Sequence, residues 1–230
     1  HAGTYDPHDF LTQRGMGRWA GGIETAWWSE VDAVFVATEF HRRMLIHRRM
    51  FTSSGRIHVT GFPLFQESQR VESEEKQDIV VFPHRLAPEK APEEFDQIRK
   101  LCEPKLPGWQ FIRTKDVCTT KQGYYELLRK SKVAVSCAKQ ETWGIAQQEA
   151  LFRDCIPVVP DRLSYQELYG PMFRYQTLEQ AADMVVRFAT SWEQVIKGNE
   201  FCGTTQQCAV RSSTAVHNMI QTMRDFGWAV

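Results

Sequence analysis

The sequence predicts an α/β protein with parallel β-sheets and helices between successive strands. Short apolar runs rich in Val and Ile recur along the chain, as at 79–82 and 156–159, and such runs are typical of strands buried on both faces. Amphipathic segments separate the runs, as at 178–190. Hydrophobic residues make up 42% of the 230 residues, which is ordinary for a globular protein with a packed core.

Residues 1–65 hold too few elements for an independent domain. The sequence predicts a strand at 31–38, a helix at 39–50 and a short strand at 57–60. Two strands bury little core. We therefore expect 1–65 to be the second part of a first domain that is truncated at its N-terminus, completed by a missing segment or by a second chain.

Residues 66–77 are polar and charged and predict a linker. Beyond them, strands and helices alternate regularly. The predicted strands are 79–82, 109–113, 132–137 and 156–159, and the predicted helices are 92–101, 121–130, 144–152, 165–169 and 178–190. The tail predicts one more helix at 212–226.

Composition excludes several classes of protein. Lys and Arg total 28, as do Asp and Glu, so the chain has no excess positive charge for a nucleic-acid surface beyond a local patch. It has no apolar run of about eighteen residues, so no membrane-spanning helix is expected. The six cysteines form no CxxC pair, which argues against a zinc ribbon and fits a reducing, cytoplasmic location.

Two glutamates flank the turn between a predicted strand and helix. Glu141 follows the strand, Gly144 opens the helix and Glu149 lies about two turns into it. Ligands of open α/β sheets bind at the carboxyl ends of strands, and a carboxylate there can accept hydrogen bonds from ribose or sugar hydroxyls. The alternatives are a helix-capping role for Glu141 and a solvated position for Glu149.

Two cations follow an earlier strand, at Arg85 and Lys90. A planar guanidinium and a mobile ammonium suit a diphosphate. The alternative is a pair of exposed surface cations. With the glutamates, they predict a nucleotide-sugar pocket.

The turn before the predicted helix would add backbone N–H groups for the diphosphate. Its residues are Thr142, Trp143, Gly144 and Ile145. Gly144 would let the backbone approach closely, and Trp143 is expected to pack rather than react.

Both motifs, in this order and spacing, resemble the donor-site signature of retaining glycosyltransferases with the GT-B fold. The segments PHRLAPEKAPEEF and VSCAKQETWGIAQQEALFRDCIPVVPDRLSYQELY are similar to the tRNA-queuosine mannosyltransferase-like family and its phage and bacterial relatives. The resemblance covers residues 78–170 well and 1–65 more loosely.

The resemblance implies two Rossmann-like domains with parallel sheets. Residues 1–65 would belong to the acceptor-side domain, 66–77 to a linker, 78–205 to the donor-binding domain and 206–230 to a helix packing back on the first domain. The implied reaction moves a sugar from a UDP- or GDP-sugar to a hydroxyl, without a metal or another cofactor.

The first domain would supply further catalytic groups. The resemblance implies that a histidine at the place of His1 lies beside the transferred sugar. Asp6 would act as a base for the acceptor hydroxyl, and Glu141 would hold a sugar hydroxyl or steady positive charge near the anomeric carbon. The alternatives are a frayed terminus for His1 and a turn aspartate before Pro7 for Asp6.

A basic helix and nearby tryptophans suggest contact with nucleic acid. The residues are Arg42, Arg43, Arg48 and Arg49, with Trp19, Trp27 and Trp28. The alternative is a solvated cationic face with tryptophans in the core. The glycine-rich stretch 14–22 does not match GxGxxG and predicts a mobile loop or a long turn.

The resemblance favours an acceptor hydroxyl on a modified base of DNA or tRNA. A glycan, lipid or small-molecule acceptor stays open. So does a non-catalytic module that binds a nucleotide sugar or a nucleic acid.

Overall fold

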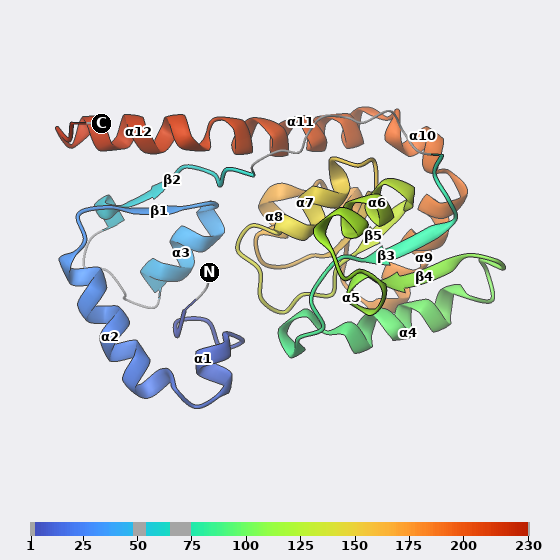
Figure 1. Ribbon diagram of the computed structural model, residues 1–230, viewed down its shortest axis with the longest axis horizontal. Helices are drawn as coiled ribbons and strands as arrows, with labels where there is room; N and C mark the ends of the chain where they lie inside the picture. Colours follow the sequence, from blue (N-terminus) through green and yellow to red (C-terminus); the bar gives the residue numbers. More distant parts are fainter. Residues whose placement is uncertain (1–2, 48–53, 65–74, 230) are drawn as a thin grey trace. The chain divides into compact units, whose positions relative to one another are not determined.

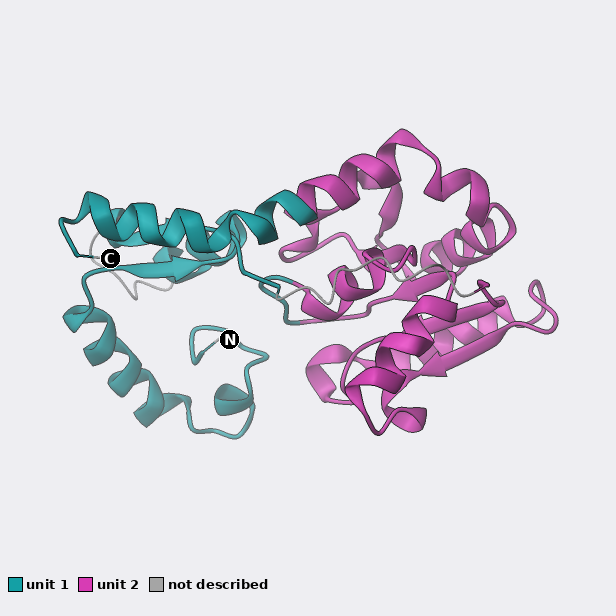
Figure 2. Cartoon of the chain, turned by 45° about the horizontal axis from the view of Figure 1, so that its top comes forward, with its two compact units in different colours: residues 1–64, 140–143, 209–230 teal, residues 65–139, 144–208 magenta. Residues whose placement is uncertain are grey.

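The computed structural model describes residues 3–47, 54–64 and 75–229 (Figure 1). Contacts divide the chain into two compact units, shown in Figure 2: unit 1 takes residues 1–64, 140–143 and 209–230, and unit 2 takes 65–139 and 144–208. Most of the predicted linker lies outside the described residues. The domain boundaries drawn from the sequence stay predictions.

Unit 2 is built on a five-stranded sheet in the order β4-β3-β5-β6-β7, with every neighbouring pair parallel. The strands are β3 (Ile79–Phe82), β4 (Gln110–Arg113), β5 (Val133–Val135), β6 (Ile156–Pro160) and β7 (Arg174–Tyr175). The central strands are wholly buried. This confirms the predicted parallel α/β architecture.

Helices cover both faces of this sheet (Figure 1). Helices α4 (Pro92–Cys102) and α9 (Leu178–Thr190) pack together on one face, where the Phe95 ring lies 5.3 Å from the Phe82 ring. On the other face, α6 (Lys121–Lys130) and α7 (Ile145–Leu151) bury apolar side chains against Val81. Successive strand residues point to opposite faces, so Val81 and Phe82 serve different layers.

Short elements complete unit 2. They are η2 (Pro88–Lys90), α5 (Thr114–Val117), α8 (Tyr165–Leu168), η3 (Pro171–Phe173), α10 (Trp192–Ile196) and most of α11 (Asn199–Ser213). The sequence did not predict the two-residue strand β7, because so short a segment has no readable periodicity. Across the described ranges, no helix combines the length and the apolar character needed to cross a membrane.

Unit 1 contains a small parallel sheet and several helices. The elements are α1 (Phe10–Gln13), α2 (Gly17–Glu30), β1 (Val34–Val36), α3 (Glu39–His47), η1 (Ser54–Arg56), β2 (Ile57–Val59) and α12 (Ala215–Asp225). Strand β1 pairs with β2 in the register Val34 to Ile57. Tyr5, Val36, Leu45 and Ile57 form the core of this unit.

The prediction of a glycine-rich loop at 14–22 is wrong from Gly17 onward, because α2 begins there. The backbone N–H of Thr4 donates to the Glu24 carboxylate at 2.9 Å, which fastens the helix to the preceding segment. A Cβ at Gly21 would lie 3.3 Å from Thr4 Oγ1, so the missing side chain allows this close approach. Tertiary contacts therefore outweigh the low helix propensity of glycine.

Helix α12 packs beside the end of β2 within unit 1. Asn218 Nδ2 donates to the Thr60 carbonyl oxygen at 3.2 Å, and the Phe226 ring meets the His58 ring edge-on at 5.5 Å. Gly61 follows β2 with a φ of +82°, and a Cβ there would lie 2.2 Å from the Arg211 carbonyl oxygen. Only glycine fits this crossing.

Gly61→Ala is expected to lower the free energy of unfolding by about 2 kcal/mol or more, because it adds left-handed strain and a backbone clash. Gly22→Ala is the control, since a Cβ at this position in α2 meets nothing within 4 Å. That change should stabilise the protein by about 0.5–1 kcal/mol. Urea unfolding measures both, and equal effects would contradict the close packing at Gly61.

Candidate functional site

The winding direction of the sheet in unit 2 changes between β3 and β5. The chain leaves β3 toward β4 on one side and then crosses to β5 on the other side. Loops that leave two adjacent strands in opposite directions open a crevice, and open α/β sheets bind ligands there. Arg85 and Lys90 follow β3, while residues 136–145 follow β5. The topology therefore brings the two predicted motifs to the same edge of the sheet.

The loop after β3 is held by its own ion pair and by the neighbouring loop. Arg85 is largely exposed, and its Nε donates to Glu89 Oε1 at 2.8 Å. The Lys139 N–H donates to the Glu89 carbonyl oxygen at 2.8 Å, which joins this loop to the one after β5. Lys90 ends the η2 turn and is buried. One predicted cation thus lies at the surface and the other inside the loop.

Side chains from β7 and from the segment after β6 hold the loop after β5 in place. The Arg162 guanidinium donates to the Cys137 and Ala138 carbonyl oxygens, each at 3.0 Å. The Tyr175 hydroxyl donates to the Ser136 carbonyl oxygen at 2.9 Å. These bonds satisfy carbonyls that the strand no longer pairs, so the loop that leads to α7 has a defined path.

Glu149 on α7 accepts hydrogen bonds from three side chains of α6. Its Oε1 accepts hydrogen bonds from Lys121 Nζ at 2.6 Å and from the Tyr125 hydroxyl at 2.9 Å. Its Oε2 accepts from the Tyr124 hydroxyl at 2.9 Å. The Glu149 side chain is 14% exposed, so the solvated alternative does not describe it. Three donors from α6 orient this carboxylate.

The same contacts shift the donors' pKa values. Burial, followed by the charge of Glu149, raises the pKa of Tyr124, so its hydroxyl stays a donor at neutral pH. Burial alone would lower the pKa of Lys121, but hydrogen bonds to Glu149 and Tyr125 outweigh burial and raise it. Arg153 places its guanidinium 3.9 Å from the centre of the Tyr125 ring. The cluster therefore combines one carboxylate, two neutral phenols and two cations.

Sequence reasoning missed Lys121, Tyr124 and Tyr125. They lie between 24 and 28 residues before Glu149 and belong to a different helix. One local signal was present: Lys121 stands in the first turn of α6, where no acidic residue accompanies it. A cation there opposes the helix dipole, so its position calls for a nearby anion.

Residues 140–143 pack with unit 1. Glu141 Oε1 accepts the N–H groups of Thr142 at 3.0 Å and Trp143 at 3.3 Å. The Thr142 carbonyl oxygen accepts the Thr38 hydroxyl at 2.9 Å, and Trp143 is buried. Glu141 therefore accepts hydrogen bonds from the turn that follows it, and it does not cap helix α7. The Thr142 and Trp143 N–H groups are aimed at this carboxylate.

Gly144 and Ile145 begin α7. Gly144 has a φ of +76°, a left-handed conformation that favours glycine. No side chain caps the helix start, and Ile145 is exposed. These two residues lie where the sequence predicted the end of the diphosphate loop.

The first-domain candidates lie in unit 1. His1 lies outside the described residues. Asp6 is buried, and its Oδ1 accepts the His8 N–H at 2.8 Å, as in an aspartate-initiated turn. Beside it, the Tyr5 hydroxyl lies 2.8 Å from His41 Nε2. Burial lowers the pKa of His41 to about 4, so this ring is neutral at pH 7.

The predicted nucleic-acid contacts are spread over α2 and α3. Arg42 pairs with Glu39 at 3.0 Å, Arg43 is exposed, and Arg48 and Arg49 lie outside the described residues. Trp19 and Trp27 are 57% and 67% exposed. Trp28 packs against the core of unit 1. Trp28 is therefore a core tryptophan, as the alternative interpretation held, whereas Trp19 and Trp27 are not.

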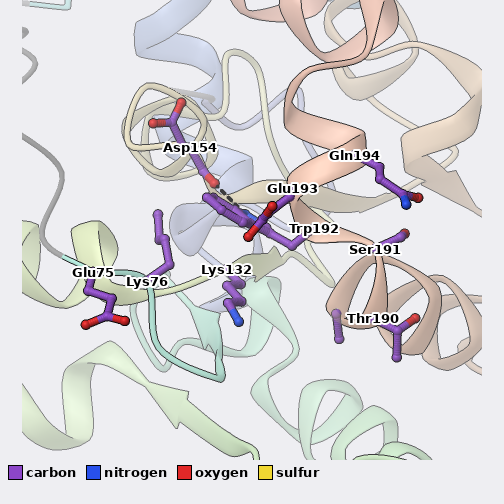
Figure 3. A pocket seen from close by; sticks show the side chains of 10 residues that line it. Glu75, Lys76, Lys132, Asp154, Thr190, Ser191, Trp192, Glu193 and Gln194 are labelled. Carbon is purple, nitrogen blue, oxygen red and sulfur yellow. Dashed lines mark hydrogen bonds between the residues drawn. The ribbon is translucent and has the colours of Figure 1, made fainter.

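An open hollow of about 600 Å³ lies at the opposite, amino edge of the sheet in unit 2 (Figure 3). Lys76, Lys132 and Asp154, which precede β3, β5 and β6, line it together with residues 189–194. Trp192 Nε1 donates to the Asp154 carbonyl oxygen at 3.0 Å across one wall. None of the predicted site residues is among its lining. Within the described ranges, no cluster of three or more His, Cys, Asp or Glu side chains could hold a metal ion.

Known proteins resemble this chain in sequence and in structure. No protein-family profile matches it. The tRNA-queuosine alpha-mannosyltransferase of Drosophila melanogaster is 30% identical over 86 residues, which are 37% of this chain and 21% of that protein. A mutant of S. aureus TarM, solved with fondaparinux, alpha-GlcNAc-glycerol and UDP, has a TM-score of 0.70 at 14% identity, covering 94% of this chain and 48% of TarM.

The pneumococcal O-GlcNAc transferase GtfA, solved with UDP and GlcNAc, has a TM-score of 0.61 at 11% identity and covers 90% of this chain and 47% of GtfA. Both solved neighbours are GT-B glycosyltransferases. The fold of this chain is therefore of the GT-B type, as the sequence predicted. The chain spans about half the length of these solved proteins and a smaller part of the curated relative.

His41 predicts a pH dependence of stability. Its pKa is about 4 when folded and near 6.5 in an unfolded chain. Between these values the unfolded chain binds the extra proton, so the free energy of unfolding falls as the pH drops from about 6.5 to 4, by up to about 3 kcal/mol. His41→Gln does not titrate there and should lose this part of the slope. Urea unfolding at several pH values compares the two proteins, and parallel curves would contradict the assignment.

Proposed function

We propose that this chain contains the donor-binding domain and part of the acceptor-side domain of a glycosyltransferase that moves a sugar from a nucleotide sugar to a hydroxyl. The observation that carries the proposal is the strand order of the GT-B-type sheet. It supports a donor site formed by Arg85 and Lys90, which follow β3, and Glu149, which follows β5, because open α/β sheets bind ligands where the winding direction changes. UDP is present in the structures of TarM and GtfA, which supports a nucleoside diphosphate as the common part of the donor.

Each donor group has a role in this proposal. Arg85 and Lys90 neutralise the diphosphate, since a guanidinium and an ammonium bind phosphate oxygens strongly. Glu149 accepts hydrogen bonds from ribose, and the residues from Thr142 to Ile145 border the diphosphate. Arg85 would exchange Glu89 for phosphate, and Glu141 would turn away from its own loop. The cations take the place of a metal ion, so no metal is needed.

The proposed reaction is retaining. The diphosphate leaves while the acceptor hydroxyl approaches the same face of the sugar. Glu141 holds a sugar hydroxyl or stabilises the positive charge that develops at the anomeric carbon. His1 and Asp6 are assigned to the sugar and to the acceptor hydroxyl, with Asp6 as the base. Because Asp6 accepts the His8 N–H in a buried turn, it has to give up this hydrogen bond before that oxygen can accept the proton of the acceptor hydroxyl.

The proposed acceptor is a hydroxyl on a modified base of tRNA or DNA, in the cytoplasm. The sequence match to a tRNA-queuosine mannosyltransferase supports it, and so do the exposed rings of Trp19 and Trp27, which can stack on bases. A glycan, lipid or small-molecule acceptor is the alternative. Donor binding that persists while tRNA and DNA binding are absent would favour that alternative.

Unit 1 is proposed to require a completing segment from the same protein or from a second chain. Its described sheet has two strands, β1 and β2, and a sheet of that size is marginal alone. Trp19, Ile23 and Trp27 share one face of α2 and are exposed. Packing of further chain on this face would shift tryptophan emission to shorter wavelength relative to this chain. Unchanged emission in the full-length protein would contradict the proposal.

Donor binding is tested by thermal shift with UDP, GDP, ADP and their sugars. A bound ligand at about a hundred times its dissociation constant should stabilise the fold by about 2.7 kcal/mol. Arg85→Ala and Glu149→Gln should each weaken binding by about tenfold or more, because each removes a charged partner of the ligand.

The matched control is Lys105→Ala, which removes an exposed ion pair with Asp183 at 2.8 Å in unit 2. It should leave binding unchanged. Binding by every variant alike would place the nucleotide elsewhere, and absence of binding by the full-length protein would contradict the function. Binding without transfer by the full-length protein would identify a non-catalytic module.

A further inference from the structure

The Glu149 carboxylate already holds most of the hydrogen bonds that it can accept. Its two oxygens offer roughly four acceptor positions. Lys121, Tyr124 and Tyr125 fill three of them. A ribose brings two neighbouring hydroxyls, and both can donate to one carboxylate. The full diol can therefore bind Glu149 only if one of the present donors leaves.

The three donors differ in how readily they can leave. Tyr124 and Tyr125 pack against the buried cluster of Val81, Leu128 and Ala134. Moving either hydroxyl away from Glu149 would pull a ring out of that packing. The Lys121 side chain is 61% exposed, and its ammonium lies 4.8 Å and 4.5 Å from the centres of the Tyr124 and Tyr125 rings. Its four-carbon chain can swing into water without disturbing the helix.

The backbone of Lys121 stays fixed when its side chain moves. Thr120 caps α6 by accepting the Gly123 N–H at 3.1 Å, so the helix start does not depend on the lysine. A cation in the first turn is disfavoured by the helix dipole. The Glu149 side chain is 14% exposed, but Tyr124 and Tyr125 keep it hydrogen-bonded when the ammonium leaves. A ribose hydroxyl that replaces the ammonium restores the third hydrogen bond, so the exchange leaves no acceptor position newly empty.

We propose that Lys121 fills, in the free protein, the hydrogen-bonding position on Glu149 that a ribose hydroxyl takes when a nucleotide binds. In the free protein its ammonium neutralises the carboxylate. When a nucleotide binds, a ribose hydroxyl takes its position on Oε1, while Tyr124 and Tyr125 stay and keep the carboxylate oriented. Competition from Lys121 thus lowers the preference of the site for a nucleotide with ribose over the same nucleotide with 2′,3′-dideoxyribose. The proposal rests on the donor site proposed above.

The test compares two ligands and three variants by isothermal titration calorimetry on the 230-residue chain. The ligands are the nucleoside diphosphate that binds the wild type, UDP or GDP, and its 2′,3′-dideoxy form. Lys121→Met removes the charge and the donor but keeps the length. It should raise the ratio of ribo to dideoxy affinity by about two- to fivefold, because ribose no longer competes with an ammonium. The ratio cancels the general loss of one positive charge.

Two variants complete the design. Lys105→Met breaks an ion pair with Asp183 at 2.8 Å in which both side chains are exposed, and it should leave the ratio unchanged. Glu149→Gln should reduce the preference for ribose. An unchanged or lower ratio in Lys121→Met overturns the proposal, and a lower ratio would make Lys121 a direct ribose ligand. A wild type that binds both forms equally refutes the ribose role of Glu149 while the donor site stands. A wild type that binds neither refutes the donor site itself.

Discussion

The change in winding direction between β3 and β5 is the constraint on which the proposed site depends. Because β4 and β5 flank β3 on opposite sides, the chain leaves β3 and β5 in opposite directions, and open α/β sheets bind ligands at such a point of the carboxyl edge. The buried apolar strands hold that edge in place. Arg85 follows one strand and Glu149 the other, so residues that lie 64 positions apart in the sequence meet the same ligand in the proposed function.

Glu149 links this edge to the packing of α6 on α7. A carboxylate that is mostly removed from water needs hydrogen-bond donors, and α6 supplies them through Lys121, Tyr124 and Tyr125. The arrangement positions a binding group on rigid helices rather than on a loop. It also explains how one residue serves stability in the free protein and ribose binding in the proposed complex, since the exposed lysine is the partner that can be exchanged.

The sequence predicted the architecture of unit 2 because its strands are continuous apolar runs that amphipathic helices separate. It missed α2, since glycines at 17, 21 and 22 read as turn residues, whereas the contact of Thr4 with Glu24 holds a helix there. It identified Glu149 but not the partners of Glu149, because only the strand order brings α6 beside α7. For Glu141, the structure shows a hydrogen bond to the next residue of its own turn, and its role toward a sugar stays a prediction.

Hydrogen–deuterium exchange with and without the nucleoside diphosphate tests the location of the donor most directly. We expect slower exchange in peptides covering 83–91 and 136–149, which follow β3 and β5, together with the start of α6. The hollow at the amino edge, lined by Lys76, Lys132 and residues 189–194, serves as the internal comparison. Protection confined to that edge, or binding without protection after β3 and β5, would contradict the account.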